Sequence, residues 1–394
     1  MSEWGIVEDI REKAVIKVIG VGGGGGNAVQ HMVNSKIEGA EFICLNTDKQ
    51  ALEKMQATSK IVLGKEVTGG LGAGTDPMKG REAALEDKDR IKEIIKGADM
   101  LFITAGMGGG TGTGAAPVIA QISKELEVLT VAVVTKPFEL EGSRRMDTAL
   151  EGINELVEEV DSLITIPNQK LLEVFGQDCP MLEAFKHAND VLSGAVRGIS
   201  DIIIRPGLIN VDFADVKTVM SERGMAMMGT GIGSGPDRAR LAAEQAIASK
   251  LLEDVSLQDA KGVLVNITAG PDLTQGEFQS VLDCIEVFAA KEATIVTGTV
   301  VDESIGNDLV VTVIATGLGD SCSRRVSTAS KQITMNQIST SGFNDSKSLP
   351  LSSAAREILE KPPMEKKESK GPEEKESQED DYLDIPSFVR AQID

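Results

Sequence analysis

The chain has 394 residues, a length that leaves room for two or three domains with sizeable cores. Its apolar share of 41% and charged share of 26% are ordinary for a water-soluble globular protein. Because 61 acidic residues outnumber 40 basic ones, the net charge is −21. This balance disfavours a protein that holds nucleic acid by neutralising its phosphates.

The four cysteines lie far apart in the sequence and there are only two histidines, so neither a zinc cluster nor a disulfide framework is expected. The first residues carry no apolar leader, and no run reaches about 18 apolar residues. We therefore expect a cytoplasmic protein that makes no direct membrane insertion.

Short β-branched runs alternate with amphipathic segments between residues 14 and 318, a pattern typical of α/β proteins with a largely parallel sheet. The runs that we expect to form strands are Ala14–Val21, Glu41–Asn46, Asp99–Ala105, Leu129–Thr135, Ser162–Pro167, Gly262–Ala269, Ala293–Val301 and Asp308–Thr316. Helical spacing is clearest in Ala115–Leu126, Ser143–Val160 and the long stretch Met181–Ile204.

The simplest division of the chain is two α/β domains joined by one long helix. We expect a nucleotide-binding domain over 14–178, a connecting helix over 179–205 and a smaller α/β domain over 206–318. Residues 319–381 lose periodicity and end in a mixed-charge run, which predicts a disordered linker. Apolar residues return in 382–394, and a short apolar motif on such a tether is typical of a peptide that docks on a partner.

A first cluster of glycines follows the strand that ends near Ile19. It runs from Gly20 through Gly23, Gly24, Gly25 and Gly26 to Asn27, and helical spacing begins after it. A strand, a glycine turn and a helix start bring free backbone N–H groups and a positive helix end to one point, which suits phosphate binding. The cluster also satisfies GxGxxG with Asp48 about twenty residues on, so a dinucleotide fold stays open at this point.

A second glycine cluster makes the dinucleotide interpretation less suitable. It covers 106–114, including Gly110, Thr111 and Gly112, and it too follows a strand and opens a helix. A third glycine turn covers 69–75. Several anion-binding loops around one point suit a triphosphate better than one pyrophosphate. Neither main loop contains a lysine, so a Walker-type P-loop is excluded.

The run from Gly108 to Gly114, GGGTGTG, resembles the tubulin signature loop, and the wider sequence resembles the FtsZ family of bacterial tubulin-like division GTPases. The likeness extends from about residue 14 to 319 and resumes at 382–394. It implies a tubulin-like α/β fold with a parallel-sheet GTP-binding domain, a long central helix, a second smaller α/β domain and a disordered tail.

The resemblance also implies roles for single residues. Both glycine loops, from Gly23 to Asn27 and from Gly110 to Gly112, would bind the phosphates of GTP or GDP. Glu141 and Arg145 match nucleotide contacts of the family, although an ordinary i,i+4 ion pair explains them equally well. Asp190 matches the residue that recognises guanine, and Phe185 could stack on the base. Routine use on a long helix remains the alternative for both.

The candidate hydrolytic residues are Asn210, Asp212 and Asp215. Two acids three residues apart at a helix start could polarise a water molecule, yet helix capping explains them as well. In the resembling family this loop acts on the GTP of the neighbouring subunit. That role implies a head-to-tail homopolymer, which would form the division-ring scaffold at mid-cell.

A Mg²⁺ ion is expected to bridge the phosphates, with no dedicated protein ligands and with Asp48 as an outer-shell helper. The terminal peptide resembles the FtsZ segment that docks on membrane-anchoring division proteins. Its expected anchors are Leu383, Ile385, Pro386 and Phe388.

Two other functions remain as alternatives on the sequence: a nucleotide-binding scaffold that does not hydrolyse, and a nicotinamide-dependent oxidoreductase. The second would need a proton-relay residue, and His31 and His187 lie in unsuitable helical contexts.

Overall fold

The computed structural model describes residues 14–176, 179–205, 207–209, 211–252, 260–290 and 292–318. These residues lie in one compact unit. The expected linker (319–381), the expected docking peptide (382–394) and the candidate catalytic residue Asn210 lie outside the described residues.

Ten strands form one sheet in the order β3-β2-β1-β4-β5-β6-β7-β10-β8-β9. Their bounds are β1 Ile16–Val21, β2 Ala40–Asn46, β3 Ser59–Val62, β4 Met100–Gly106, β5 Leu129–Lys136, β6 Ser162–Pro167, β7 Gly224–Gly233, β8 Gly262–Ala269, β9 Thr294–Val301 and β10 Leu309–Leu318. The run from β3 to β7 is parallel, whereas β10 is antiparallel to both of its neighbours. The sheet is therefore parallel where the glycine loops lie and mixed in its C-terminal part.

The parallel strands are buried on both faces, which explains their nearly continuous apolar sequences. Along β4, Met100 and Phe102 belong to the core on one face, while Leu101 and Ile103 belong to the core on the other. Successive side chains of a strand point to opposite faces, so both faces need a covering layer of helices.

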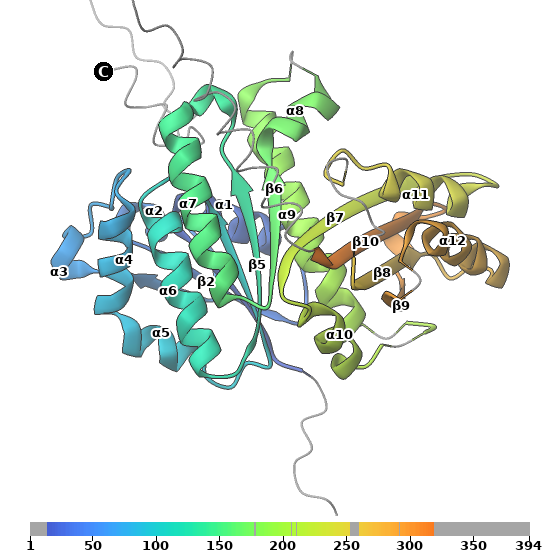
Figure 1. The fold of residues 1–394 in the computed structure, drawn as a ribbon, viewed down its shortest axis with the longest axis horizontal. Coiled ribbons are helices and arrows are strands. Elements are labelled where there is room, and N and C mark those ends of the chain that lie inside the picture. The colour runs from blue at the N-terminus through green and yellow to red at the C-terminus, as the bar shows by residue number, and fades with distance from the viewer. Residues whose placement is uncertain are drawn as a thin grey trace, which may run out of the picture. The chain divides into compact units, whose positions relative to one another are not determined.

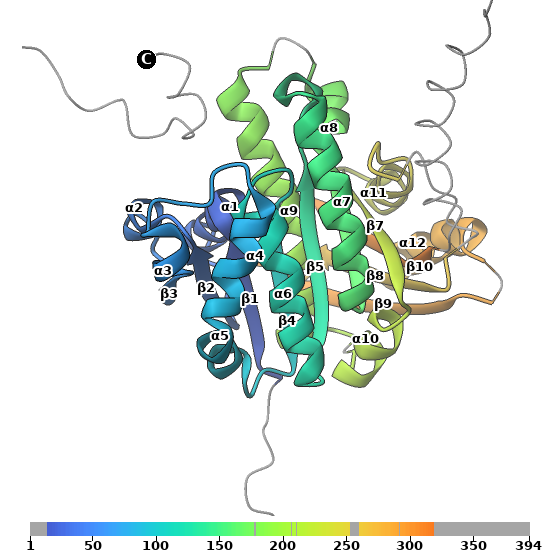
Figure 2. The same ribbon diagram turned by 60° about the vertical axis from the view of Figure 1, so that its left-hand side comes forward.

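Helices supply these layers (Figures 1 and 2). One face carries α1 (Gly22–Asn34), α8 (Asn168–Phe175), α9 (Met181–Ile204) and α10 (Phe213–Met220), and the other carries α4 (Pro77–Glu86), α5 (Lys88–Ile95), α6 (Thr111–Glu125) and α7 (Ser143–Glu159). A third core joins α11 (Arg238–Ile247) and α12 (Gln275–Phe288) to the C-terminal strands. The short helices α2 (Lys49–Glu53) and α3 (Lys65–Thr68) flank β3.

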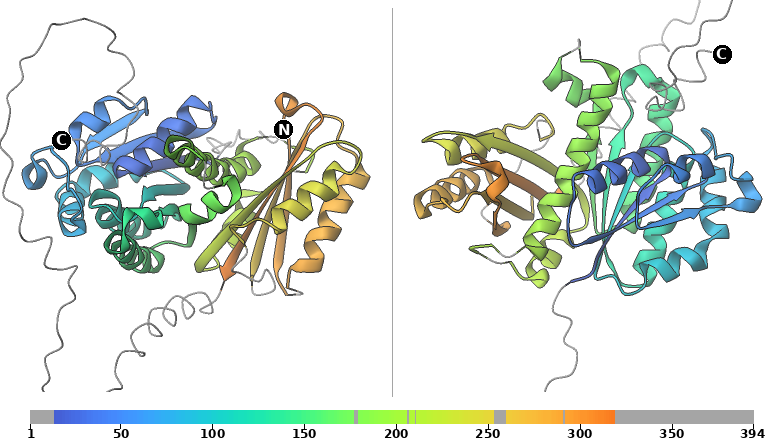
Figure 3. Two further views of the ribbon diagram at one scale, coloured as in Figure 1. Left: turned by 90° about the horizontal axis from the view of Figure 1, so that it is seen from above. Right: turned by 180° about the vertical axis from the view of Figure 1, so that it is seen from behind.

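The long helix α9 runs between the parallel part of the sheet and the C-terminal strands (Figure 3). Its Ala195 and Ile199 are fully buried, and its Gly198 lies against Thr312 of β10. The helix has the predicted bounds. Strand β7 pairs with β6 over three residues, so the sheet is continuous past the helix. The division into two domains remains a prediction.

Two strands were not predicted, and their composition explains why. β3 has only four residues, and β7 is rich in glycine and methionine. The glycines of β7 have a packing reason, because Cβ atoms at Gly229, Gly231 and Gly233 would overlap carbonyl oxygens of Ala246, Ala242 and Arg238 in or beside α11. Because α11 lies so close to β7, glycines occupy positions where a strand usually has β-branched residues, and strand prediction depends on those residues.

The glycine clusters are more helical than expected. α1 begins at Gly22 and α6 at Thr111, so both glycine runs include the first turns of their helices.

Among the residues that the structure describes, no helix combines the length and the apolar character needed to cross a bilayer.

Candidate nucleotide-binding and catalytic sites

The two main glycine loops meet because β1 and β4 are parallel neighbours whose carboxyl ends lie at one edge of the sheet. Glycine is required there by close backbone packing. A Cβ atom at Gly25 would overlap the carbonyl oxygen of Thr104, and one at Gly24 would lie 3.1 Å from the Cα atom of Gly106. Gly22 has a φ of +71°, a conformation that favours glycine. The predicted convergence of the loops is confirmed.

Hydrogen bonds that involve the side chains of Thr111 and Thr113 hold the second loop in shape. The backbone N–H of Gly108 donates to Oγ1 of Thr113 at 2.8 Å, and the hydroxyls of Thr111 and Thr47 lie 2.6 Å apart. A Cβ atom at Gly112 would lie 2.5 Å from the carbonyl oxygen of Gly106. A Cβ atom at Gly22 would lie 2.9 Å from the backbone nitrogen of Gly112, so the start of α6 lies beside the start of α1.

Two glycines of these loops have no neighbour that explains them. A Cβ atom at Gly23 or at Gly109 would meet no atom of the described residues within 4 Å. Gly23 is exposed, and no acidic residue lies in the first turn of α1 or α6. Open space beside two helix starts, each with unpaired amides and a positive end, fits a bound anion.

The third turn packs against the second glycine loop and the start of α2. The N–H of Gly110 donates to the carbonyl oxygen of Gly74 at 2.9 Å, and that of Lys49 donates to Gly70 at 3.0 Å. Asp48 lies beside this turn, but its carboxylate caps α2 by accepting from the N–H groups of Gln50 at 2.8 Å and Ala51 at 3.2 Å. Capping thus accounts for Asp48 without a metal or a ribose.

Glu141 and Arg145 form the ion pair that their spacing predicted, with 3.2 Å between Oε2 and Nε. The other carboxylate oxygen of Glu141 accepts from the N–H of Phe138 at 2.9 Å, and the side chain is only 6% exposed. This geometry supports the alternative of a structural pair. Their contact with a nucleotide stays a prediction.

Phe185 and Asp190 both lie in α9. The Phe185 ring packs edge-to-face on buried Phe138, with 5.2 Å between centroids. Asp190 is exposed, and its Oδ1 lies 2.8 Å from Nε2 of His31 in α1. Nδ1 of His187 lies 3.5 Å from the other carboxylate oxygen. Sequence reasoning did not predict this use of the histidines, because only the packing of α1 on α9 brings His31 to Asp190.

The candidate catalytic acids lie at the start of α10. Asp212 occupies the N-cap position, but its side chain accepts no hydrogen bond from the helix amides. Asp215 lies in the first turn, and both residues are exposed. Among the described residues neither carboxylate has a hydrogen-bond or ion-pair partner, so capping does not account for Asp212.

The loop before α10 is anchored to β9. The N–H of Ile209 donates to Oγ1 of Thr299 at 2.8 Å, and the N–H of Thr299 donates to the Ile209 carbonyl at 3.2 Å. A Cβ atom at Gly207 would overlap the Thr299 carbonyl oxygen. The position of this loop therefore depends on the C-terminal part of the sheet.

Four charged residues tie the end of α9 to the segment after β9. Arg197 contacts Asp201 at 3.1 Å and Asp302 at 3.0 Å, and Arg205 contacts them at 3.3 and 3.5 Å. Burial raises the pKa of Asp201, although both arginines oppose the shift. Hydrogen bonds from Ser304 lower the pKa of Asp302. This network fixes Arg205 just before the candidate catalytic loop.

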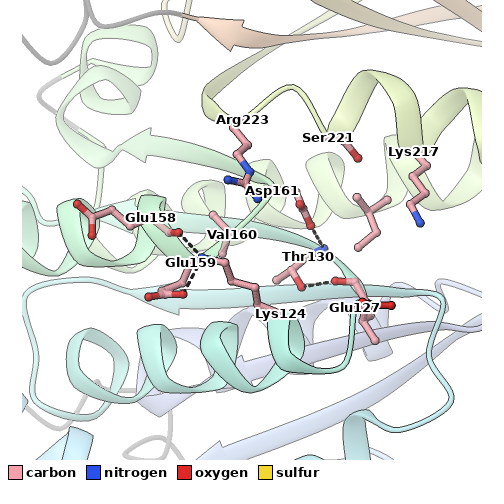
Figure 4. A pocket seen from close by; sticks show the side chains of 12 residues that line it. Lys124, Glu127, Thr130, Glu158, Glu159, Val160, Asp161, Lys217, Ser221 and Arg223 are labelled. Carbon is pink, nitrogen blue, oxygen red and sulfur yellow. Dashed lines mark hydrogen bonds and ion pairs between the residues drawn. The ribbon is translucent and has the colours of Figure 1, made fainter.

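The two candidate sites lie at opposite ends of the parallel strands. The glycine loops follow the carboxyl ends of β1 and β4. At the amino ends, α9 finishes where a Cβ atom at Gly39, just before β2, would overlap Ile204, and α10 finishes where the Ser162 hydroxyl of β6 donates to the Met220 carbonyl at 2.8 Å. The segment with the two acids lies between these helix ends. A cavity of about 200 Å³ at that end is lined by residues of α10 and of the segments before β5 and β6, including Lys124, Asp161 and Lys217 (Figure 4). Strands of seven residues at about 3.3 Å per residue separate the ends by roughly 20 Å.

No group of three or more His, Cys, Asp or Glu residues that could hold a metal occurs within the described part of the chain. These residues therefore do not form an all-protein magnesium cage, and a Mg²⁺ ion that bridges the phosphates stays a prediction.

The fold and the paired glycine loops define a tubulin-like GTPase. The profile of the Tubulin/FtsZ family GTPase domain matches residues 15–176, and that of the FtsZ family C-terminal domain matches 224–319. The chain belongs to the tubulin/FtsZ family and is a GTPase of cell division. The oxidoreductase alternative and the non-hydrolysing alternative are accordingly set aside.

The similarity covers nearly the whole chain. It is 56% identical to the cell division protein FtsZ of Pseudomonas aeruginosa, over 99% of both chains, and 55% identical to that of Coxiella burnetii, over 96% of both. Among solved structures, an FtsZ dimer from M. jannaschii matches with a TM-score of 0.75 at 45% identity, covering 79% of this chain and 89% of the other.

Proposed function

We propose that this GTPase hydrolyses GTP at a site completed by a second copy of the chain in a head-to-tail polymer. The separation of the two sites carries the proposal. Roughly 20 Å of parallel sheet lies between the phosphate-binding loops and the ends of α9 and α10, and the two acids lie in the segment between these helix ends, so hydrogen-bond reach is far exceeded. Asp212 and Asp215 therefore act on a nucleotide held by another subunit.

The phosphates bind at the starts of α1 and α6. Backbone N–H groups of Gly23 and Gly24 in the first turn of α1, and of Thr111 and Gly112 in the first turn of α6, donate to phosphate oxygens. Gly25, Gly26, Asn27 and Gly110 belong to the same two loops and shape them around the phosphates. The open space at Gly23 and Gly109 supports this role, because a side chain there would occupy the volume of the ligand. The two positive helix ends add electrostatic attraction for a triphosphate.

The base and sugar bind beside α9. The Asp190 carboxylate accepts from the ring N–H and the exocyclic amine of guanine, a donor pair that adenine lacks. Phe185, half-buried and held against Phe138, offers a ring for stacking. Glu141 and Arg145 approach the nucleotide as a pair, since each fixes the position of the other.

In catalysis Asp212 and Asp215 orient the attacking water and accept its proton, and Asn210 contributes a polar side chain from the same loop. Their exposure and the lack of partners for the two acids among the described residues support this role, since a general base must have a free lone pair. A Mg²⁺ ion bound with the phosphates would supply charge neutralisation.

A site shared in this way uses two different surfaces of each subunit, one with the glycine loops and one with α10. Such a heterologous contact repeats along an open filament. The similar M. jannaschii structure is described as an FtsZ dimer, so that relative associates with itself. The polymer is proposed as the scaffold of the division ring at mid-cell.

Replacement of Asp212 by alanine tests the shared site. We expect Asp212→Ala to bind GTP as the parent does and to lose about a hundredfold in turnover, as for loss of a general base. Asp237→Ala is the matched control, because Asp237 is also an exposed N-cap residue without a side-chain cap bond. Parental turnover by Asp212→Ala would contradict the proposal.

Dilution gives a second test that needs no variant. If two subunits form the site, GTP turnover per subunit rises with protein concentration and shows a threshold. Turnover per subunit that stays constant down to the lowest measurable concentration would mean that one subunit suffices.

The terminal peptide is proposed to recruit membrane-anchoring division proteins through Leu383, Ile385, Pro386 and Phe388. Its mixture of apolar residues after a charged run supports docking, and Pro386 lowers the entropy lost on binding. Removal of residues 382–394 should leave GTP turnover unchanged and abolish recruitment to membranes that carry an anchoring protein. Recruitment of the shortened chain would refute this role.

A further inference from the structure

Both histidines of the chain converge on one carboxylate. His31 reaches Asp190 from α1, and His187 approaches it from the preceding turn of α9. Asp190 is the residue proposed above to recognise guanine. The two histidines are 156 residues apart in sequence (187 − 31 = 156), so only the tertiary fold creates this cluster.

The two contacts differ in strength. Nε2 of His31 lies 2.8 Å from Oδ1 of Asp190, a close ion-pair contact. Nδ1 of His187 lies 3.5 Å from Oδ2, which is beyond that length, and its ring stacks on Phe175 with 3.8 Å between centroids. His31 is thus the group that holds the carboxylate.

The geometry points to His31 as a positioning residue that sets the preference for guanine by orienting Asp190, an inference that rests on the proposed role of Asp190. Nε2 of His31 is in ion-pair contact with Oδ1. A carboxylate has about four lone-pair sites, so one remains on Oδ1 and two on Oδ2 for the two guanine donors.

The surroundings explain why Asp190 needs such a partner. Its side chain is 45% exposed on the surface of α9, whereas that of His31 is 25% exposed. An exposed aspartate samples several rotamers, and a bidentate contact with a base requires one of them. The contact from α1, the helix whose start binds the phosphates, also connects the base-binding residue to the phosphate-binding element.

Inosine diphosphate is the probe for this role, because it lacks the exocyclic amine of guanine and keeps the ring N–H. The full-length chain is titrated with GDP and IDP by displacement of a fluorescent GDP analogue, in the absence of GTP. We expect His31→Ala to lower the preference for GDP over IDP by about fivefold. Thermal unfolding of the same samples separates this effect from lost stability.

Two variants serve as controls. His31→Gln keeps an N–H donor at about the same distance along the side chain and should retain most of the preference. Gln30→Ala changes the neighbouring residue of α1, which bonds the backbone N–H of Gln56 at 2.6 Å and not Asp190, and should retain all of it. If His31→Ala proves unfolded, loss of the preference in His31→Gln overturns the inference.

An unchanged or increased preference for GDP in folded His31→Ala would also overturn it, and would leave His31 as a tie between two helices. Asp190→Asn distinguishes this failure from failure of the proposed function. If Asp190→Asn keeps the parental preference, the guanine role of Asp190 is wrong. If Asp190→Asn loses it while His31→Ala does not, only the role of His31 is wrong.

Discussion

Gly25 of α1 lies against the backbone of Thr104 in β4, so close that a Cβ atom on Gly25 would overlap the Thr104 carbonyl oxygen. Gly23, two residues earlier in the same helix, faces open space. The same glycine run thus contains one position that is required for packing and one that the packing leaves unexplained.

This contrast gives a prediction for a matched pair of variants. Gly25→Ala should lower the free energy of unfolding by about 2–3 kcal/mol, because the methyl group forces β4 and α1 apart. Gly23→Ala should leave stability unchanged or slightly higher, since alanine favours a helix, and should weaken GTP binding at least tenfold. Unfolding in urea and nucleotide titration measure the two quantities. Equal destabilisation by both changes would contradict the assignment.

The hydrogen bond between Ile209 and Thr299 predicts that β9 controls the candidate catalytic loop. Thr299→Val removes the hydroxyl that accepts the Ile209 N–H at 2.8 Å and leaves that donor without its partner. We expect a loss of about 1–2 kcal/mol in stability and a several-fold lower turnover at saturating protein and GTP. Affinity for GTP should not change.

Thr297→Val is the control for that experiment, because Thr297 is in the same strand two residues away and no side-chain hydrogen bond of its own is described. Measurement of both turnover and GTP affinity separates an effect on the catalytic loop from an effect on the nucleotide-binding site. Parental turnover in Thr299→Val would show that the loop keeps its position without β9.

The ion pair between Arg238 and Glu277 predicts a pH-dependent contribution to stability. Arg238 is 5% exposed and contacts Glu277 at 2.6 Å and Asp272 at 2.9 Å. Hydrogen bonds from Arg238 lower the pKa of Glu277 from 4.5 to about 2. Because the folded-state pKa is depressed, the stabilisation is complete above pH 4.5 and is lost as the pH falls from 4.5 towards 2.

Comparison with Glu277→Gln isolates this contribution from the other carboxylates. The parent should exceed the variant by about 2–3 kcal/mol in free energy of unfolding at pH 7, and the difference should shrink between pH 4.5 and 2. Glu286→Gln on the exposed side of α12 should show little difference at any pH. A gap between parent and Glu277→Gln that is constant across this range would rule out titration of Glu277 as its source.

Sequence alone predicted eight of the ten strands and the long helix α9, because alternation, apolar runs and helical spacing are local properties of the chain. It also predicted that two glycine loops meet, since neighbouring parallel strands end at one edge. It failed at β7, where glycines pack against α11 and no β-branched pattern is needed.

Residue types and spacing left two interpretations for Asp212, which could cap a helix or act in catalysis. They also left two for Glu141 and Arg145, which could form an ion pair or contact the nucleotide. Only the tertiary structure shows that the Asp212 side chain makes no cap bond and that Glu141 and Arg145 are paired. It alone puts the glycine loops and α10 at opposite ends of the sheet and His31 beside Asp190. The physical reason is that a motif is a local property of the sequence, whereas the distance between two side chains that are far apart in sequence depends on how whole helices and strands pack.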